Sequence, residues 1–179
     1  GRRGHRQLAD VFDLRAPRLR TITADARPFL RRTTERYDAI LVDAYRPPYV
    51  PFYLATKEFF ELVRKRLRPG GIVALNVATT PDNHDLADNI GGTLATVLPR
   101  AFAWQPLRFN QIVLGQAGEP TGREPPAPAA VNPLVADLRA NLRPIRPSGD
   151  PWTDDRAPVE WITDRMIVEF AAGGGRFEE

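Results

Sequence analysis

The feature that most constrains this chain is a strand–helix–strand succession in its first half. Tyr37–Asp43 is a continuous apolar run bounded by charge, as expected of a central parallel strand covered on both faces. Thr56 predicts the N-cap of a helix that runs to Leu67 with one apolar stripe. The sequence Arg-Pro-Gly-Gly then ends the helix, and Gly71–Val77 reads as a second buried strand. This order of elements is typical of α/β folds.

The other patterns of the first 116 residues continue the alternation. Thr80-Pro81-Asp82 predicts a helix start, with an N-cap, a proline at the first helical position and an acid in the first turn. The remaining expected elements are a strand over Arg18–Asp25, helices over Pro28–Glu35 and from Thr80 to about Leu98, and hairpin strands over Ala101–Leu107 and Asn110–Gly115. Together they predict a doubly wound α/β sheet.

The composition changes after residue 116 and divides the chain into three parts. Residues 1–116 form the predicted α/β domain. Residues 117–132 are a Pro-rich linker without core-forming residues. Residues 133–179 are a predicted helical extension, with amphipathic patterns over Pro133–Leu142 and Val159–Phe170.

Composition also excludes several classes of function. The 179 residues include no cysteine and only two histidines, so we expect no disulfide, no thiol nucleophile and no metal. No apolar run is long enough to span a membrane, and the charged N-terminus is unlike a signal peptide. The N-terminal segment is rich in arginine, which could indicate nucleic-acid binding. However, 23 of the 25 basic residues of the whole chain are arginines, and this favours a compositional bias over nucleic-acid binding. A cytoplasmic protein is expected, and a homo-oligomer stays open.

Polar residues stand at the ends of three predicted strands. Asp25 ends the first in "TADARPFL", Asp43 ends the second in "LVDAYRPP", and Asn76 lies at the end of the third. In open α/β sheets, ligands bind beyond the carboxyl ends of the parallel strands, so these residues point to one crevice. The alternative is that each acid caps the helix or turn that follows it. For the two acids together, we favour a binding site.

Longer stretches of the chain resemble a known family. The segments "ADARPFL", "YDAILVDAY" and "LATKEFFELVRKRLRPGGIVALNV" resemble, in this order, the catalytic domain of spermidine synthases, the polyamine aminopropyltransferases. The bacterial homologues fused to transporter-like membrane segments are the most similar, and "TDDRAPVEWITDRMI" resembles their C-terminal end. Class I methyltransferases share the "D-A" and "L-x-P-G-G" elements, so an S-adenosylmethionine-dependent methyltransferase is the alternative.

The resemblance implies a fold, a reaction and a site. The fold is an α/β sheet of the Rossmann-like class I methyltransferase type. The reaction transfers an aminopropyl group from decarboxylated S-adenosylmethionine to a polyamine precursor or other amine, and needs no metal. By the same resemblance, Asp25 and Ala26 would hold the adenine, and Asp43 would face the attacking amine. The membrane would be reached only through transporter-like segments outside this sequence.

The chain departs from the family pattern at two places. The family loop after the catalytic acid carries a second acid, and Arg46 stands at that position here. The family's glycine-rich turn and ribose-binding acid find no match either, so we expect the first two strands of the sheet to be absent, between Arg18–Asp25 and Tyr37–Asp43. A further alternative is therefore a fragment or a degenerate homologue that is a non-catalytic remnant or an interaction module, and nucleotide binding is expected to be weak.

Four further residues are candidates for substrate contacts. Tyr45 and Tyr49 flank the loop after Asp43 and could line a substrate slot, or simply pack on that proline-rich loop. Asp154 and Asp155 could attract a cationic polyamine, or belong to a solvated turn.

Overall fold

The computed structural model describes residues 20, 22–44, 49–119 and 133–176. The elements of these residues are α2 (Ala26–Arg32), β1 (Tyr37–Val42), a 3-10 turn η1 (Phe52–Leu54), α3 (Lys57–Arg66), β2 (Leu67–Ala78), α4 (Asp85–Val97), β3 (Arg100–Leu107), β4 (Asn110–Gln116), α5 (Pro133–Asn141), β5 (Arg143–Pro144) and α6 (Val159–Ala172).

The described strands form one five-stranded mixed sheet in the order β1-β2-β4-β3-β5. β1 and β2 run parallel, with Ala39 opposite Ile72 and Val42 opposite Leu75. The pairs β2–β4, β3–β4 and β3–β5 are antiparallel. The parallel pair and the hairpin that the sequence predicts are therefore confirmed, and the sheet has the α/β architecture expected of it.

Helix α3 forms where the sequence places it, for local reasons. The Thr56 hydroxyl accepts a hydrogen bond from the Phe59 amide at 3.4 Å and so caps the first turn. Two glycines then lie in the first part of β2, which begins directly after α3 at Leu67. Gly70 has a φ of 76°, a conformation that favours glycine. A Cβ on Gly71 would lie 2.9 Å from the Arg68 carbonyl and 3.0 Å from that of Tyr37, so only glycine fits where β1 and β2 approach.

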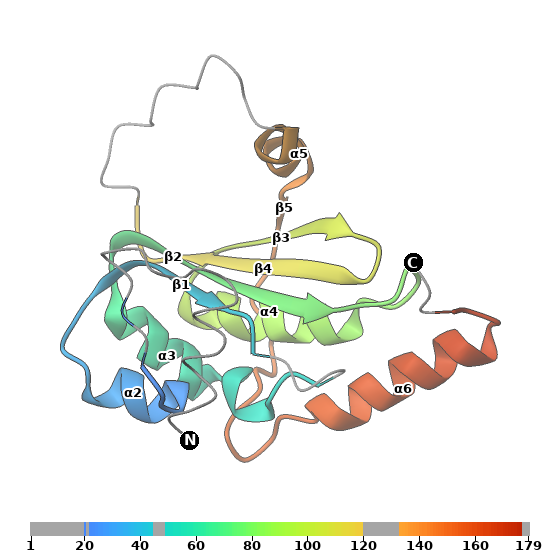
Figure 1. The fold of residues 1–179 in the computed structure, drawn as a ribbon, viewed down its shortest axis with the longest axis horizontal. Helices are drawn as coiled ribbons and strands as arrows, with labels where there is room; N and C mark the ends of the chain where they lie inside the picture. The colour runs from blue at the N-terminus through green and yellow to red at the C-terminus, as the bar shows by residue number, and fades with distance from the viewer. Residues whose placement is uncertain (1–19, 21, 45–48, 120–132, 177–179) are drawn as a thin grey trace.

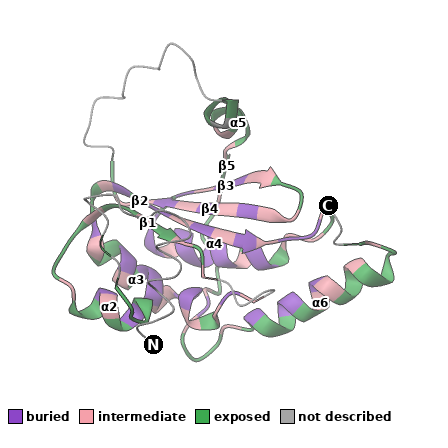
Figure 2. Ribbon diagram, viewed as in Figure 1, coloured by how far each residue is buried: buried purple, intermediate pink, exposed green. Residues whose placement is uncertain are grey.

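The core lies between the sheet and the two long helices on one of its faces. Figure 1 shows α3 and α4 below the sheet, and Figure 2 shows the buried residues on that side. Alternate residues of β2 face these helices and are fully buried, because side chains of a strand point to opposite faces in turn. The buried side chains of this layer include Val73, Leu75, Val77, Phe59, Phe60, Leu86, Ile90, Leu94 and Val113.

Two sequence predictions about strands are wrong. β1 is not a central strand covered on both faces: it is the edge strand of the described sheet, and Leu41 is 75% exposed. Within the range predicted as a strand, Arg18–Asp25, the described residues 20 and 22–25 have no strand structure, and Ile22 is 43% exposed. An extended segment becomes a strand only by pairing with a neighbour, and these described residues pair with none of the described strands.

Two predicted helices begin at other residues. α2 starts at Ala26 rather than Pro28, because Asp25 supplies the N-cap. α4 starts at Asp85 rather than near Thr80. Thr80 and Asn83 exchange backbone hydrogen bonds in a tight turn, and the Asn83 side chain accepts from the Asp85 amide at 3.0 Å. The turn therefore takes the place of the first helical residues that the sequence predicts.

The described C-terminal part packs on the same sheet and core. β5 adds to the edge of β3, and α6 buries Val159, Ile162 and Met166 as the sequence predicts. Trp152 is buried in the core, and its backbone amide donates to the Thr93 hydroxyl at 3.0 Å. The boundaries drawn at residues 116 and 132 stay predictions, and residues 120–132 of the linker lie outside the described residues.

Candidate active site

Asp43 and Asn76 meet at the carboxyl ends of the two parallel strands. Asp43 directly follows β1, and Asn76 lies near the end of β2 on the adjacent strand. The Asn76 Nδ2 donates to Asp43 Oδ1 at 3.2 Å. The Asp43 carboxylate is exposed, so it can receive a ligand from solvent while an amide holds one of its oxygens.

A third residue extends this contact along the sheet edge. Asn110 begins β4, and its Nδ2 donates to the Asn76 Oδ1 at 2.8 Å. Sequence reasoning did not find Asn110. The only signal would have been the strand order, which places β4 beside β2 and cannot be read from the hairpin pattern.

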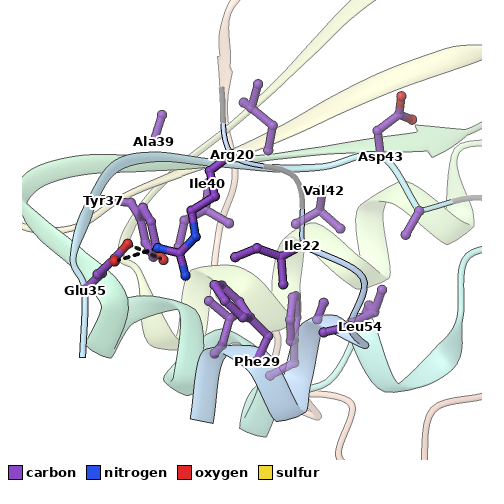
Figure 3. Close-up of a pocket in the computed structure, with 16 residues that line it drawn as sticks. Arg20, Ile22, Phe29, Glu35, Tyr37, Ala39, Ile40, Val42, Asp43 and Leu54 are labelled. Carbon is purple, nitrogen blue, oxygen red and sulfur yellow. Dashed lines mark hydrogen bonds and ion pairs between the residues drawn. The ribbon is translucent and has the colours of Figure 1, made fainter. Parts of the chain in front are cut away.

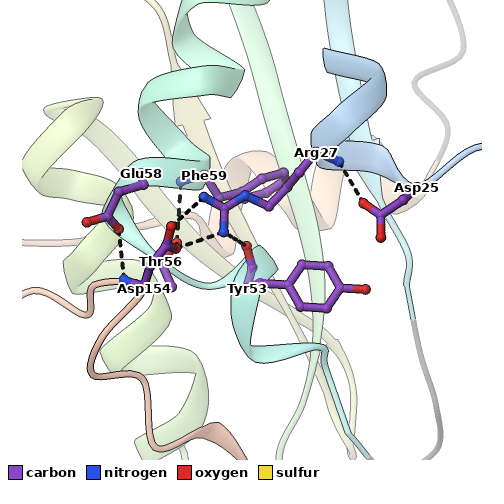
Figure 4. Close-up of polar contacts among 7 residues, drawn as sticks. All are labelled: Asp25, Arg27, Tyr53, Thr56, Glu58, Phe59 and Asp154. Atoms are coloured by element: carbon purple, nitrogen blue, oxygen red, sulfur yellow. Dashed lines mark hydrogen bonds and ion pairs between the residues drawn. The ribbon is translucent and has the colours of Figure 1, made fainter. Parts of the chain in front are cut away.

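Asp25 acts as the N-cap of α2 in the structure. Its Oδ1 accepts from the Arg27 amide at 3.0 Å, as Figure 4 shows. The capping alternative is therefore realised for one of the two carboxylate oxygens. Both Asp25 and Ala26 are exposed, and their role in holding adenine stays a prediction.

A groove of about 610 Å³ runs along the outer edge of β1, as Figure 3 shows. Ala26 and Asp43 both line it, so two of the predicted site residues share one surface. Most of its wall is apolar and includes Ile22, Phe29 and Leu54. The groove lies in the place where the sequence analysis expects two strands of the family's sheet. We therefore place the candidate site at the carboxyl end of β1 and do not assign the whole groove to a ligand.

Asp154 is bound to Arg27 of helix α2, as Figure 4 shows. The guanidinium donates from Nη1 to Oδ1 and from Nη2 to Oδ2, both at 2.7 Å. The Thr56 hydroxyl donates to Oδ1 at 2.7 Å, and Arg27 Nη1 also donates to the Tyr53 carbonyl at 3.2 Å. Arg27 is only 8% exposed, although it is an arginine. Sequence reasoning did not find this pair, because 127 positions separate the two residues.

This contact favours the ionised form of both residues. The hydrogen bond from Arg27 is the main cause that lowers the pKa of Asp154 below its ordinary value. The same hydrogen bond raises the pKa of Arg27. Since both oxygens of Asp154 already accept hydrogen bonds, its polyamine contact stays a prediction. Asp155 is exposed on the neighbouring turn, and its contact with substrate is likewise untested.

Tyr49 is tied to helix α6. Its hydroxyl donates to Asp164 Oδ1 at 2.5 Å, and this hydrogen bond is the main cause that raises the pKa of Tyr49. The nearby charge of Glu160 raises it further. The sequence analysis missed Asp164, whose only signal was its place one helical turn after Glu160 in the segment that resembles the family. Tyr45 and Arg46 lie outside the described residues.

The described residues contain neither a candidate metal site nor a candidate membrane-spanning helix. No three His, Cys, Asp or Glu side chains gather there in a way that could hold a metal ion. No helix in the same ranges has both the length and the apolar character needed to cross a membrane.

Comparison with known families identifies the chain. The family model described as the spermine/spermidine synthase domain matches residues 6–108, which include Asp25, Asp43 and Asn76. The chain belongs to the spermine/spermidine synthase domain family. The match covers the three N-terminal segments on which the sequence resemblance rests, whereas the C-terminal segment "TDDRAPVEWITDRMI" lies beyond it.

Individual relatives of this spermine/spermidine synthase domain agree. A probable polyamine aminopropyl transferase of Bifidobacterium longum is 36% identical over 88 residues, which is 43% of this chain. A spermine synthase of Arabidopsis thaliana is 36% identical over 101 residues, or 55% of the chain. The crystal structure of a probable spermidine synthase from Corynebacterium glutamicum aligns with 92% of the chain at a TM-score of 0.54 and 22% identity, which supports the fold.

These alignments cover only part of each relative. The matched segments span 20% of the Bifidobacterium protein, 27% of the Arabidopsis protein and 56% of the Corynebacterium structure. The activity of the complete relatives therefore enters below as a proposal.

Proposed function

We propose that this protein acts in aminopropyl transfer. In this reaction an amine nitrogen attacks the propyl carbon bonded to the sulfonium of decarboxylated S-adenosylmethionine. A carbon–nitrogen bond forms, the carbon–sulfur bond breaks, the sulfur keeps the electron pair, and the amine loses a proton. The observation that carries the proposal is the family match over residues 6–108, within which Asp43 occupies the carboxyl end of a parallel strand.

Asp43 would act on the amine. A primary amine has a reference pKa near 10, as in lysine, and is therefore a cation at neutral pH. A carboxylate at the strand end attracts this cation and, once the ammonium has released a proton to water, aims the nitrogen lone pair along the line of the carbon–sulfur bond. Its low reference pKa, about 3.9, makes it a weak general base, so orientation is its main contribution. Asn76 supports this role by holding one carboxylate oxygen.

The other predicted residues would complete the site from two sides. Asp25 and Ala26 at the start of α2 would receive the adenine of the aminopropyl donor, with the carboxylate accepting from the exocyclic amine. Tyr49, held by Asp164, would line the amine side with Tyr45, while Asp154 and Asp155 would add negative potential. We also propose a cytoplasmic location, alone or as the cytoplasmic part of a membrane-fused protein.

The test is product release by the complete gene product. With decarboxylated S-adenosylmethionine and a panel of diamines, we expect methylthioadenosine. With S-adenosylmethionine, we expect no S-adenosylhomocysteine, which a methyltransferase would release instead. Asp43→Asn should lower kcat about 100-fold, because the amine loses its charged partner.

Asp38→Asn is the matched control. It removes an exposed carboxylate from the other end of the same strand, where Asp38 pairs with Arg68 at 2.7 Å. Its activity should equal that of the wild type. Equal activity of Asp43→Asn and wild type would contradict the role of Asp43, and S-adenosylhomocysteine release would contradict the reaction.

A further inference from the structure

Asn110 is the far end of a hydrogen-bonded row that leads to the proposed amine-orienting carboxylate. The strand order β1-β2-β4 places Asp43, Asn76 and Asn110 on three neighbouring strands. Asn110 Nδ2 donates to Asn76 Oδ1 at 2.8 Å, and Asn76 Nδ2 donates to Asp43 Oδ1 at 3.2 Å. The row thus crosses the carboxyl edge of the parallel pair.

The chemistry of an amide gives this row a direction. The Asn76 side chain carries an acceptor oxygen on one side and a donor NH₂ on the other, whereas an ionised carboxylate only accepts. Because Asn110 donates to the oxygen of Asn76, the NH₂ of Asn76 is turned toward Asp43. The reverse orientation would place the amide oxygen against the carboxylate. Asn110 therefore stabilises this orientation of Asn76, because it donates to the amide oxygen that is left on the side away from Asp43.

The backbone holds the donor at a fixed place. Asn110 lies opposite Ala78 in the antiparallel pair of β2 and β4. The Thr79 amide donates to the Phe109 carbonyl at 2.9 Å, one residue before Asn110. A side-chain donor whose backbone is held in a strand pair can orient a second side chain more accurately than a donor on a loop.

We propose that Asn110 is a positioning residue for Asp43, acting through Asn76. The inference rests on the proposed function, in which Asp43 aims the attacking amine. Among the described residues, the hydrogen bond from Asn76 is the one that Asp43 accepts, and it uses only one of the two carboxylate oxygens. It thereby sets the tilt of the carboxylate. A nucleophile displaced by about 1 Å from the line of attack can lose about 100-fold in rate.

Asn110→Asp is the decisive variant, because it keeps the shape of the side chain and replaces the donor by an acceptor. The carboxylate at position 110 then competes with Asp43 for the NH₂ of Asn76 and leaves the Asn76 oxygen without its donor. In the complete gene product, kcat for methylthioadenosine release should fall about 10- to 100-fold, while KM for decarboxylated S-adenosylmethionine changes less than about twofold. Asn110→Ala removes the donor without reversing it, so its loss in kcat should be smaller.

Gln105→Glu is the matched control, since it adds the same negative charge to the same hairpin. Gln105 Nε2 contacts the Arg108 carbonyl and not Asn76. Its kcat should equal that of the wild type. The NMR signals of the Asn76 side-chain amide should shift in Asn110→Asp and stay in place in Gln105→Glu, independently of activity.

The outcomes separate the two proposals. Wild-type kcat in a folded Asn110→Asp or, if that variant does not fold, in Asn110→Ala overturns the role of Asn110 and leaves the proposed function standing. A loss of kcat that comes with a parallel rise in KM for the nucleoside also overturns it, because a general distortion of the site would do the same. A wild type that releases no methylthioadenosine overturns the proposed function, and this inference with it.

Discussion

Replacing Asp154 by alanine should destabilise the protein more than replacing its partner Arg27 by methionine. The reason is an asymmetry of burial. The Arg27 side chain is 10% exposed, whereas that of Asp154 is 40% exposed. Asp154→Ala leaves a guanidinium in the interior without its two charged hydrogen bonds, while Arg27→Met leaves a carboxylate that water and Thr56 can still satisfy.

The magnitudes follow from this geometry. Removing one partner of a buried ion pair costs about 3–5 kcal/mol. Because water reaches Asp154, we take the lower end, about 3 kcal/mol, for Asp154→Ala, and a lost charged hydrogen bond, about 1.5 kcal/mol, for Arg27→Met. For a chain of this size, 3 kcal/mol corresponds to a Tm lower by about 6–12 °C. Adding Arg27→Met to Asp154→Ala should restore part of the stability, since no unpaired buried charge remains.

Chemical denaturation of the three variants and the wild type measures the coupling directly. The pH dependence gives a second reading. The pKa of Asp154 is lowered in the folded protein from 3.8, so its contribution is complete above that value and is lost as pH falls through the folded pKa. The stability difference between wild type and Asp154→Asn should therefore be constant near neutral pH and shrink below about pH 4. Additive effects in the double variant would refute the reasoning.

Two further predictions concern Tyr49 and the edge of the sheet. The hydrogen bond to Asp164 raises the pKa of Tyr49 above 10.0, so ultraviolet titration should show this tyrosine ionising at a higher pH than a free tyrosine. Asp164→Asn should bring the pKa of Tyr49 back toward 10.0. An unchanged titration in this variant would contradict the contact. Leu41 is 75% exposed on β1, so Leu41→Lys should change the free energy of unfolding by less than about 0.5 kcal/mol. Phe60→Ala, in the core, should lower the free energy of unfolding by about 3–5 kcal/mol in the same denaturation assay. Equal effects of Leu41→Lys and Phe60→Ala would show that the outer face of β1 is covered.

The sequence alone determined the elements whose signals are local. Helix α3 has its N-cap at Thr56 and ends at Arg66, shortly before Gly70-Gly71, all within one short stretch. The hairpin of β3 and β4 and the apolar face of α6 are likewise set by spacing along the chain. The motif order around Asp43 was enough to predict the family that the comparison confirms.

The tertiary structure decided everything that depends on neighbours in space. The apolar run of β1 predicts burial on both faces, yet burial requires a layer or strand on each side, and β1 lies at the edge of the described sheet. The segment before Asp25 has the composition of a strand, yet its described residues 20 and 22–24 have no pairing partner in the described sheet and form no strand.

The site contacts show the same division most clearly. Sequence reasoning found Asp43 and Asn76, because strand ends can be recognised from the strands themselves. It could not find Asn110, because that contact exists only once β4 is inserted beside β2. Nor could it pair Arg27 with Asp154, since residues 127 positions apart meet only when the C-terminal segment docks against α2 and α3. Local hydrogen bonding and periodicity are fixed by adjacent residues, whereas charge pairing and amide orientation are fixed by the packing of distant ones.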